Sequence, residues 1–449
     1  MSRGAPPAPP HGPWTRRGRA LRFTAEAAAG LTGPEWLRRR RAEAFDEFES
    51  LPLPSEKEEV WRYSPIDSLD LDGFFPSAAG AEPPEGFVAE VAAEVAPHSA
   101  VVAVVGGRPA SVSRPGLPES VVISGLAAAA PDRSVLGEVL AGGDALVRLN
   151  DAFLPDALVV DVPAGVVVEA PIVVVHWLGG TGAPAWFPRT VVRVGEGGRA
   201  AVVEVLAGPA GRSLVVPVTE LSVGDEGTLS HVSLQVLGDE TWHIGRLAAR
   251  AGRAARLATF SVGLGAAYDR SRTDAAADGP GAHCELRSVH LGTGDQVHDV
   301  RTMQDHRAPR TTSDLLSKGA VAGASRSVYS GLIRVRRGAV RTEAFQTNHN
   351  LVLDARAHAD SVPNLDIEEN DVRCSHASTV GPVDEDQRYY LESRGVPPER
   401  AERLIVLGFF DDIVERCPVP EATGRLRREV GSRLVGALVH DNPGGGGGG

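Results

Sequence analysis

Cysteine is scarce in this chain of 449 residues, which contains only Cys284, Cys374 and Cys417. The three lie far apart, their number is odd, and no Cys-x-x-Cys pair occurs. This pattern argues against a disulfide framework and against a structural zinc site. We therefore expect the protein to work in a reducing compartment, the cytoplasm.

Several functional motifs are also missing. There is no Gly-x-x-x-x-Gly-Lys-Ser/Thr loop, so we expect no nucleotide site on the chain itself. The nucleophile elbow Gly-x-Ser-x-Gly, the zinc motif His-Glu-x-x-His and the EF-hand loop are absent as well.

Long hydrophobic runs are absent too. No sustained apolar stretch follows Arg16-Arg17, and the most apolar region, 158–178, is interrupted by Asp161 and Pro163. The sequence thus predicts neither a targeting segment nor a membrane span. The net charge of −12 is spread along the chain, which predicts no binding to nucleic acid or to an anionic membrane.

Glycine and proline are plentiful where aromatic residues are few. The chain has 51 Gly and 33 Pro, and aromatic residues make up 5%. A long helical bundle tolerates Gly and Pro poorly, so this composition favours a β architecture with many turns.

Short β-branched runs separated by Gly or Pro begin near residue 157. The runs have the length of strands: 158–162, 166–168, 172–175 and 190–194. A turn that usually contains glycine then precedes an alternating segment at intervals of roughly 25–30 residues, at 197–205, 226–234, 251–260, 279–288 and 338–345. This pattern predicts a β-solenoid whose coils bury their inward side chains against each other. A β-sandwich is the alternative that the degenerate repeats leave open.

Helical patterns flank the predicted solenoid. We expect helices from Pro34 to Phe48, around 134–153, and over 384–392, 398–415 and 426–438. The predicted domains are an N-terminal arm and mainly helical region (1–155), a β-helix core (156–384), a C-terminal helical region (385–443) and a disordered glycine tail (444–449).

Few residues in the core region suggest chemistry. Asp274 and Asp278 form the only close carboxylate pair that suggests acid–base chemistry, and we interpret them as solvated acids in a loop rather than as a glycosidase pair. Histidines are dense in the second half of the chain, at 283, 290, 298, 306, 349, 358 and 376. Cys374-Ser375-His376 places a thiol and an imidazole on the same face of a strand, as a metal- or sulfur-handling pair or as a buried Cys beside a hydrogen-bonded His.

Longer stretches around this motif carry a family resemblance. The segments 347–353 (TNHNLVL), 361–367 (SVPNLDI), 371–381 (DVRCSHASTVG) and 384–395 (DEDQRYYLESRG) resemble the SufB/SufD family of iron–sulfur cluster assembly proteins. Glu59-Val-Trp-Arg-Tyr63, Lys318-Gly319 and Ser327–Leu332 also look like family positions. The resemblance covers most of the chain from about residue 55 to 416.

Within the family, the chain is more similar to the SufD form. A SufB scaffold carries a Cys where Asn348 stands and a Glu where Ala377 stands, and both are thought to serve cluster building. Cys374-Ser375-His376 matches the SufD motif, although Ala377 replaces a common Gly. The resemblance therefore implies a cluster-assembly site at His376 and Cys374 that is shared with a partner, with His376 as the metal ligand.

The family's known features give further expectations. They imply a right-handed parallel β-helix between helical ends, a SufB-like paralogue as partner, a SufC-like ABC ATPase, and recipient apo-proteins served indirectly. The chain itself would be non-enzymatic, would meet iron or a transient iron–sulfur cluster at the partner interface, and would belong to a complex on which flavin can bind.

The amphipathic helix near the C-terminus gives a candidate partner surface. Its apolar residues can bind the ATPase or pack within the chain itself: Leu404, Leu407, Phe410, Ile413 and Val414. Two rival functions stay open at this point, a SufB-type cluster scaffold and a β-helix carbohydrate-active enzyme.

Overall fold

The computed structural model describes residues 22–127, 135–140 and 142–439. The predicted N-terminal arm and glycine tail lie outside these residues. Within them, no helix combines the length and the apolar character that crossing a bilayer requires.

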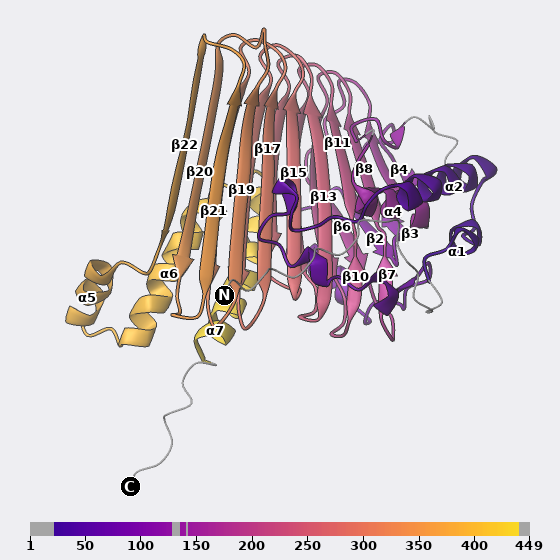
Figure 1. The fold of residues 1–449 in the computed structure, drawn as a ribbon. Helices are drawn as coiled ribbons and strands as arrows, with labels where there is room; N and C mark the ends of the chain where they lie inside the picture. The colour runs from indigo at the N-terminus through magenta and orange to yellow at the C-terminus, as the bar shows by residue number, and fades with distance from the viewer. Residues whose placement is uncertain (1–21, 128–134, 141, 440–449) are drawn as a thin grey trace, which may run out of the picture.

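Two long sheets that face each other form the body of the molecule (Figure 1). The first sheet has the order β21-β19-β17-β15-β13-β11-β8-β5-β4, with the short strands β1, β7 and β10 to one side. Its strands are β1 (Phe75–Pro76), β4 (Val122–Gly125), β5 (Leu158–Val162), β7 (Pro184–Trp186), β8 (Arg189–Val194), β10 (Ser213–Val215), β11 (Val218–Val223), β13 (Thr241–Ala251), β15 (Tyr268–Ala277), β17 (Val297–His306), β19 (Arg326–Val335) and β21 (His358–Ile367).

The second sheet has the order β22-β20-β18-β16-β14-β12-β9-β6-β2-β3. Its strands are β2 (Ala100–Val105), β3 (Arg108–Ser113), β6 (Ile172–Trp177), β9 (Arg199–Ala207), β12 (Thr228–Val236), β14 (Arg256–Gly263), β16 (His283–Gly292), β18 (Thr312–Val321), β20 (Thr342–Val352) and β22 (Val372–Gly381). From β8 onward the long strands alternate between the sheets and pair in parallel with the strand one coil away, which confirms the solenoid and excludes the β-sandwich.

The register gives the length of each coil. Six positions lie in one line across the second sheet, at intervals of 29, 28, 27, 29 and 31 residues: Arg199, Thr228, Arg256, His283, Thr312 and Glu343. All five repeats predicted from glycine turns thus fall at the same corner of the solenoid. The predicted strand at 166–168 does not form; only an isolated bridge joins Val167 to Arg199.

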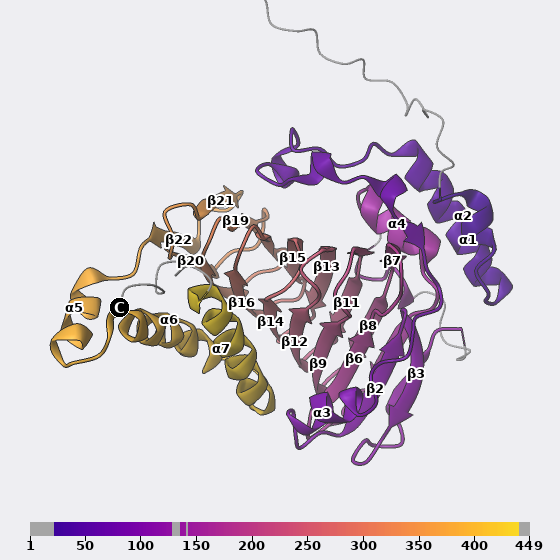
Figure 2. The same cartoon turned by 90° about the horizontal axis from the view of Figure 1, so that it is seen from below.

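Helices cover both outer faces. The N-terminal helices are α1 (Ala25–Ala29), α2 (Glu35–Ser50), α3 (Phe87–Ala93) and α4 (Ala145–Phe153), with single 3-10 turns at Glu59–Trp61, Ile66–Ser68 and Leu71–Gly73. The C-terminal helices are α5 (Glu385–Ser393), α6 (Pro398–Val414) and α7 (Thr423–Val439), with a 3-10 turn at Pro420–Ala422. Figure 2 shows α1, α2 and α4 on the side of the first sheet and α6 and α7 along the second.

The helical boundaries largely match the prediction. Asp384 caps α5 by accepting from the amides of Asp386 and Gln387, and Pro398 lies in the first turn of α6. The helix expected around 134–153 is shorter, because α4 begins only after Gly143, with Asp144 as its N-cap. The strands also begin earlier than residue 156, where we placed the start of the core, since β2 pairs with β6 and β4 pairs with β5.

Candidate functional site

The C-terminal end of the solenoid is formed by β21 and β22, the last strands of the two sheets. Each has a hydrogen-bonded neighbour on one side only, β19 for β21 and β20 for β22. The next helix, α5, packs on α6, and in the described part of the chain no helix covers the inward side of these two strands. We call this last coil, residues 358–381, the open end.

The register shows which side chains of β22 face the interior. Cys374 pairs with Ala344, His376 with Gln346 and Ser378 with Asn348, and those three partners on β20 are all buried. Neighbouring side chains in register share a face of the sheet, so Cys374 and His376 lie on one face, as the motif predicted, and the register shows that this face points inward. His376 is nevertheless exposed, because no further coil lies over it.

Cys374 behaves mainly as a core residue. It packs against the last apolar cluster of the interior, which contains Ile333, Val335 and Ala344. Burial raises the pKa of its thiol above the usual 9.0, so the thiol is protonated near neutral pH. A protonated thiol is a poor nucleophile and a poor metal ligand, which leaves His376 as the stronger candidate.

Asn348 is buried at the position where a SufB scaffold would carry its Cys. Its side-chain oxygen accepts hydrogen bonds from Asn350 Nδ2 and Ser361 Oγ, both at 2.9 Å. Ser378 Oγ in turn donates to Ser361 Oγ at 2.6 Å, so the two strands of the open end are joined across the interior. This position therefore supplies a filled hydrogen-bond network and no thiolate.

The open end alone offers few metal ligands. In residues 22–127, 135–140 and 142–439, no group of three or more His, Cys, Asp or Glu is arranged to hold a metal ion. On the inward face of the open end, His376 and Cys374 supply two donors, and the first is exposed. Iron or a cluster bound here as cargo would therefore need further ligands from another molecule.

Most of the other histidines in the second half of the chain have structural partners. His290 hydrogen-bonds Ser327, His306 hydrogen-bonds Thr311 and Ser313, and His358 hydrogen-bonds Asp360. The sequence did not reveal two carboxylates that each bridge a pair of imidazoles inside the solenoid, Glu204 with His176 and His231, and Asp269 with His243 and His298. Only the coil register, which single-sequence patterns did not fix, brings these residues together.

The carboxylate pair in the core does not form a hydrolytic site. Asp274 was expected in a solvated loop, but it lies in β15, is buried, and accepts hydrogen bonds from Arg246 at 2.6 Å and from Arg272. Asp278 is paired with Arg307. Because both carboxylates are held by arginines, neither is placed as a free acid or base.

Comparisons with known proteins agree with this architecture. The family model described as "SUF system FeS cluster assembly, SufBD core domain" matches residues 176–409, and the "SufBD protein N-terminal region" matches 26–174. The chain is 31% identical over 430 residues to an iron–sulfur cluster assembly SufBD family protein of Mycobacterium tuberculosis, covering 92% of this chain and 96% of that protein. The chain belongs to the SufBD family.

Two SufD proteins are among its relatives. The iron–sulfur cluster assembly protein SufD of Escherichia coli is 26% identical over 389 residues, covering 86% of this chain and 90% of that protein. SufD of Bacillus subtilis is 27% identical over 409 residues, covering 86% and 91%. This SufBD-family chain is therefore an iron–sulfur cluster assembly protein.

The candidate partner helix of this SufBD-family chain needs a correction. Phe410, Ile413 and Val414 are buried against the outer face of the second sheet, so they bind their own solenoid and not a partner. Leu407 is half-buried in the same cluster. Only Leu404, among the five predicted residues, is exposed. The helical periodicity predicted one apolar face correctly but could not say what covers it.

Proposed function

We propose that this chain is the SufD-type subunit of an iron–sulfur cluster assembly complex and that it pairs with a SufB-type paralogue through the open end. The observation that carries the proposal is an uncapped last coil that presents His376. A solenoid normally needs a polar cap at its terminal coil, because an unpaired coil exposes apolar side chains and backbone groups.

The chemistry of the open end fits another solenoid end as the occupant. Leu365 and Ile367 on β21 and Val380 on β22 are each 40–42% exposed, although their positions correspond to inward ones in earlier coils. The free edges of β21 and β22 can also accept strands from a second solenoid. A partner with a similar coil would bury these side chains and complete the hydrogen bonds of both edges.

At this interface His376 would provide one ligand to iron or to the nascent cluster. Imidazole is largely neutral at pH 7, so it can bind iron without releasing a proton of its own. The partner would supply the remaining ligands. Asn348 and Ala377 favour a role in which this chain assists the partner. A scaffold that held a cluster by itself would need thiolate or carboxylate ligands at these two positions.

The C-terminal helices suit a second contact. Tyr389 and Tyr390 on α5 and Leu404 on α6 are exposed, which gives an aromatic and apolar surface next to the open end. We propose that an ABC-type ATPase binds this surface and that its ATP-driven dimerisation strains the subunit pair. The chain itself would be non-enzymatic and cytoplasmic, and flavin would bind, if at all, to the assembled complex.

Native purification of the tagged chain tests this proposal. We expect a paralogous β-helix protein and an ABC ATPase to co-purify with it. Recovery of the chain alone or only as a homo-oligomer would contradict the proposal. Anaerobic reconstitution of the isolated chain, followed by visible absorption, distinguishes the SufB-type scaffold, because a stable cluster on the lone chain would favour that function.

A further inference from the structure

A polar column runs through the interior of the solenoid. One inward position of the second sheet is polar in seven successive coils, which are in register with one another: Glu204, Ser233, Ser261, Ser288, Ser317, Asn348 and Ser378. Neighbouring strands lie about 4.8 Å apart, so the column is roughly 29 Å long and ends at the open end. Serine at a buried position contributes less to packing than the valine and leucine found elsewhere in the interior.

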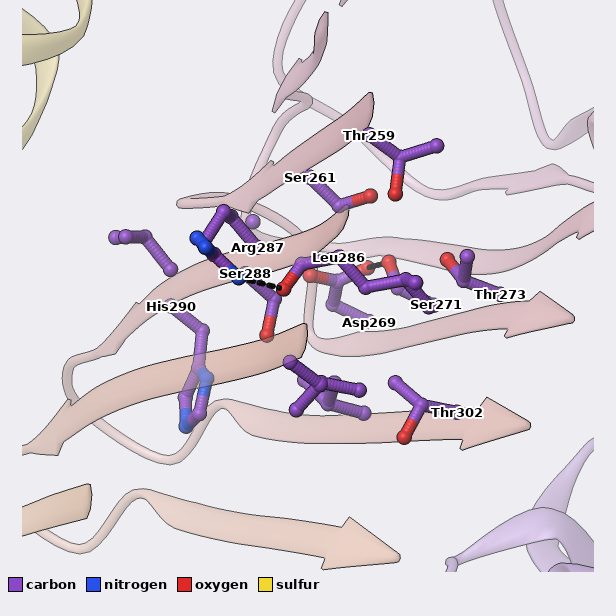
Figure 3. Close-up of a pocket in the computed structure, with 14 residues that line it drawn as sticks. Thr259, Ser261, Asp269, Ser271, Thr273, Leu286, Arg287, Ser288, His290 and Thr302 are labelled. Carbon is purple, nitrogen blue, oxygen red and sulfur yellow. Dashed lines mark hydrogen bonds between the residues drawn. The ribbon is translucent and has the colours of Figure 1, made fainter. Parts of the chain in front are cut away.

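Two cavities lie along this column. The proximal cavity, nearer the open end, is lined by Asp269, Ser288 and His290 among others, and Figure 3 shows these side chains from facing sheets directed toward one space. The distal cavity is lined by Thr219, Gln235 and His243 among others. The volume open to the centre of a water molecule is about 20 Å³ in the proximal cavity and about 50 Å³ in the distal cavity. One water needs about 10–15 Å³, so each cavity can hold water.

The two cavities meet at shared residues. Ser261, Ser271 and Thr273 line both of them. At the far side of the distal cavity, Thr219 Oγ1 donates to Glu204 Oε2 at 3.3 Å. Polar side chains thus follow one another from the proximal cavity to Glu204, beside apolar ones such as Leu206 and Leu247.

Hydrogen bonds link the proximal cavity to the open end. Ser288 Oγ donates to Ser317 Oγ at 2.7 Å, and Asn348 Nδ2 lies 3.4 Å from the carbonyl oxygen of Ser317. Asn348 is then joined to Ser361 and Ser378, as described for the open end. A chain of side chains therefore reaches from the exposed coil into the interior.

Buried imidazoles lie along the path. Glu204 is 3.0 Å from His176 Nε2 and 2.7 Å from His231 Nε2, and Asp269 is 2.6 Å from His243 Nδ1 and 3.1 Å from His298 Nδ1. A carboxylate only accepts, so in a neutral imidazole the nitrogen that faces it carries the hydrogen and the other ring nitrogen is an acceptor. His176 Nδ1, His231 Nδ1 and His298 Nε2 are buried without a partner among the described residues.

We infer that the interior is a hydrated path that carries protons between the two cavities and these imidazoles. Buried polar atoms without protein partners are normally hydrated, and the cavities provide the room. Hydroxyl groups and water both donate and accept, so each can take a proton on one side and release one on the other. The paired carboxylate offsets the charge of an imidazole that has been protonated.

The transfer balances without a redox partner. A protonated water in the proximal cavity gives one proton to a neighbouring hydroxyl or water, each relay group passes one proton onward past Ser261, and the free nitrogen of His231 receives the last. The Asn348 amide and the Ser317 carbonyl oxygen cannot take up one proton and release another, so the relay lies on their inner side. The path does not rest on the proposed function.

Hydrogen–deuterium exchange at the C2 position of histidine tests the path in the purified full-length chain. In D₂O, followed by mass spectrometry of proteolytic fragments, we expect both His298 and His231 to exchange in the folded protein. Ser261→Leu should fill the junction of the cavities and slow exchange at His231 by about tenfold or more, with little change at His298.

A control variant and two contrary outcomes make the test decisive. Ser330→Leu, at an outward and half-exposed position of β19, should slow neither histidine. The inference is overturned if His231 fails to exchange in the folded wild-type chain, or if Ser261→Leu, shown by circular dichroism to be folded, leaves the His231 rate unchanged. The measurement needs no partner and no iron, so its failure would leave the proposed assembly function intact.

Discussion

At the scale of single residues, the inward face of the open end and the neighbouring strand β20 bring together one exposed imidazole, one packed thiol and a hydrogen-bonded amide. The imidazole of His376 is the only one of the three that combines exposure with ready metal binding. Cys374 is retained in an apolar cluster, and Asn348 is already satisfied by its neighbours. The proposed metal-binding role of the open end therefore depends on His376.

His376→Ala should lower cluster assembly while leaving the complex intact, because it removes a ligand without altering the apolar contacts of the open end. The activity of iron–sulfur enzymes in cells that depend on this chain measures the effect. His358→Ala is the matched control, since His358 is an exposed histidine of the same coil but faces outward beside Asp360. Equal enzyme activity in the two variants would contradict the role given to His376.

Asp269→Asn should destabilise the fold. Burial by itself would raise the pKa of Asp269, but hydrogen bonds from His243 and His298 outweigh it and hold the pKa below the usual 3.8. Losing this buried charge should cost about 3 kcal/mol of unfolding free energy, measured by urea denaturation at pH 7. Asp366→Asn, which breaks a more exposed pair with Arg334, should cost less than about 1 kcal/mol.

The pH dependence of the same variant gives an independent check. Because the pKa of Asp269 is lower in the folded chain than in the unfolded chain, its stabilisation is present above pH 3.8 and is lost as the pH falls toward the folded value. The difference in unfolding free energy between wild type and Asp269→Asn should therefore narrow only in acid. A difference that stays constant from pH 7 down to the acid range would show that the effect comes from packing alone.

At the scale of elements, the corners of the solenoid explain why the repeats were visible yet degenerate. Each coil has a residue with a positive φ two positions before its member of the aligned series that runs from Arg199 to Glu343. These six residues are Gly197, Glu226, Ala254, Gly281, Arg310 and Arg341. Only two are glycine. The amide of this residue hydrogen-bonds the adjacent turn, as when Glu226 N donates to Arg253 O at 2.7 Å, which offsets the strain of the left-handed backbone.

This explains what a single sequence could predict here. The turn glycines and β-branched runs sufficed to predict strands and coil length, and the Cys-Ser-His spacing predicted that Cys374 and His376 share one face of a strand. They could not predict the residues in contact across coils, because register depends on turn geometry that four non-glycine residues also adopt. For the same reason, the sequence did not reveal Glu204 and Asp269 as centres of histidine pairs.

Helix α6 is tied to the solenoid through one of only two lysines. Lys318 Nζ donates to Asp412 Oδ2 at 2.6 Å and to the carbonyl oxygen of Phe409 at 2.9 Å, and the hydrogen bond from Lys318 lowers the pKa of Asp412. Lys318→Ala should weaken docking by about 2 kcal/mol, which corresponds to roughly 30-fold faster amide exchange in α6. Lys57→Ala, at an exposed site, should leave exchange unchanged. Equal rates in both variants would show that α6 docks through its apolar face alone.

At the scale of the whole molecule, the two ends of the solenoid differ. The N-terminal end closes with antiparallel strands, since β3 pairs with β2 and β4 pairs with β5, and helices lie beside it (Figure 2). The C-terminal end stops at two parallel strands with exposed apolar side chains. We therefore propose that the C-terminal end pairs with the paralogue and holds the assembly site.

A comparison of the two ends tests this assignment most directly. Val380→Asp places a charge in the open end, and Val112→Asp places the same charge on β3, at the opposite edge of the same sheet. Both valines are about 40% exposed, so both variants should fold with the circular dichroism of the wild type. Native purification of each tagged variant then measures how much paralogous β-helix protein remains bound. We predict that Val380→Asp loses the paralogue and that Val112→Asp keeps it; retention by Val380→Asp, or equal loss from both, would contradict the account.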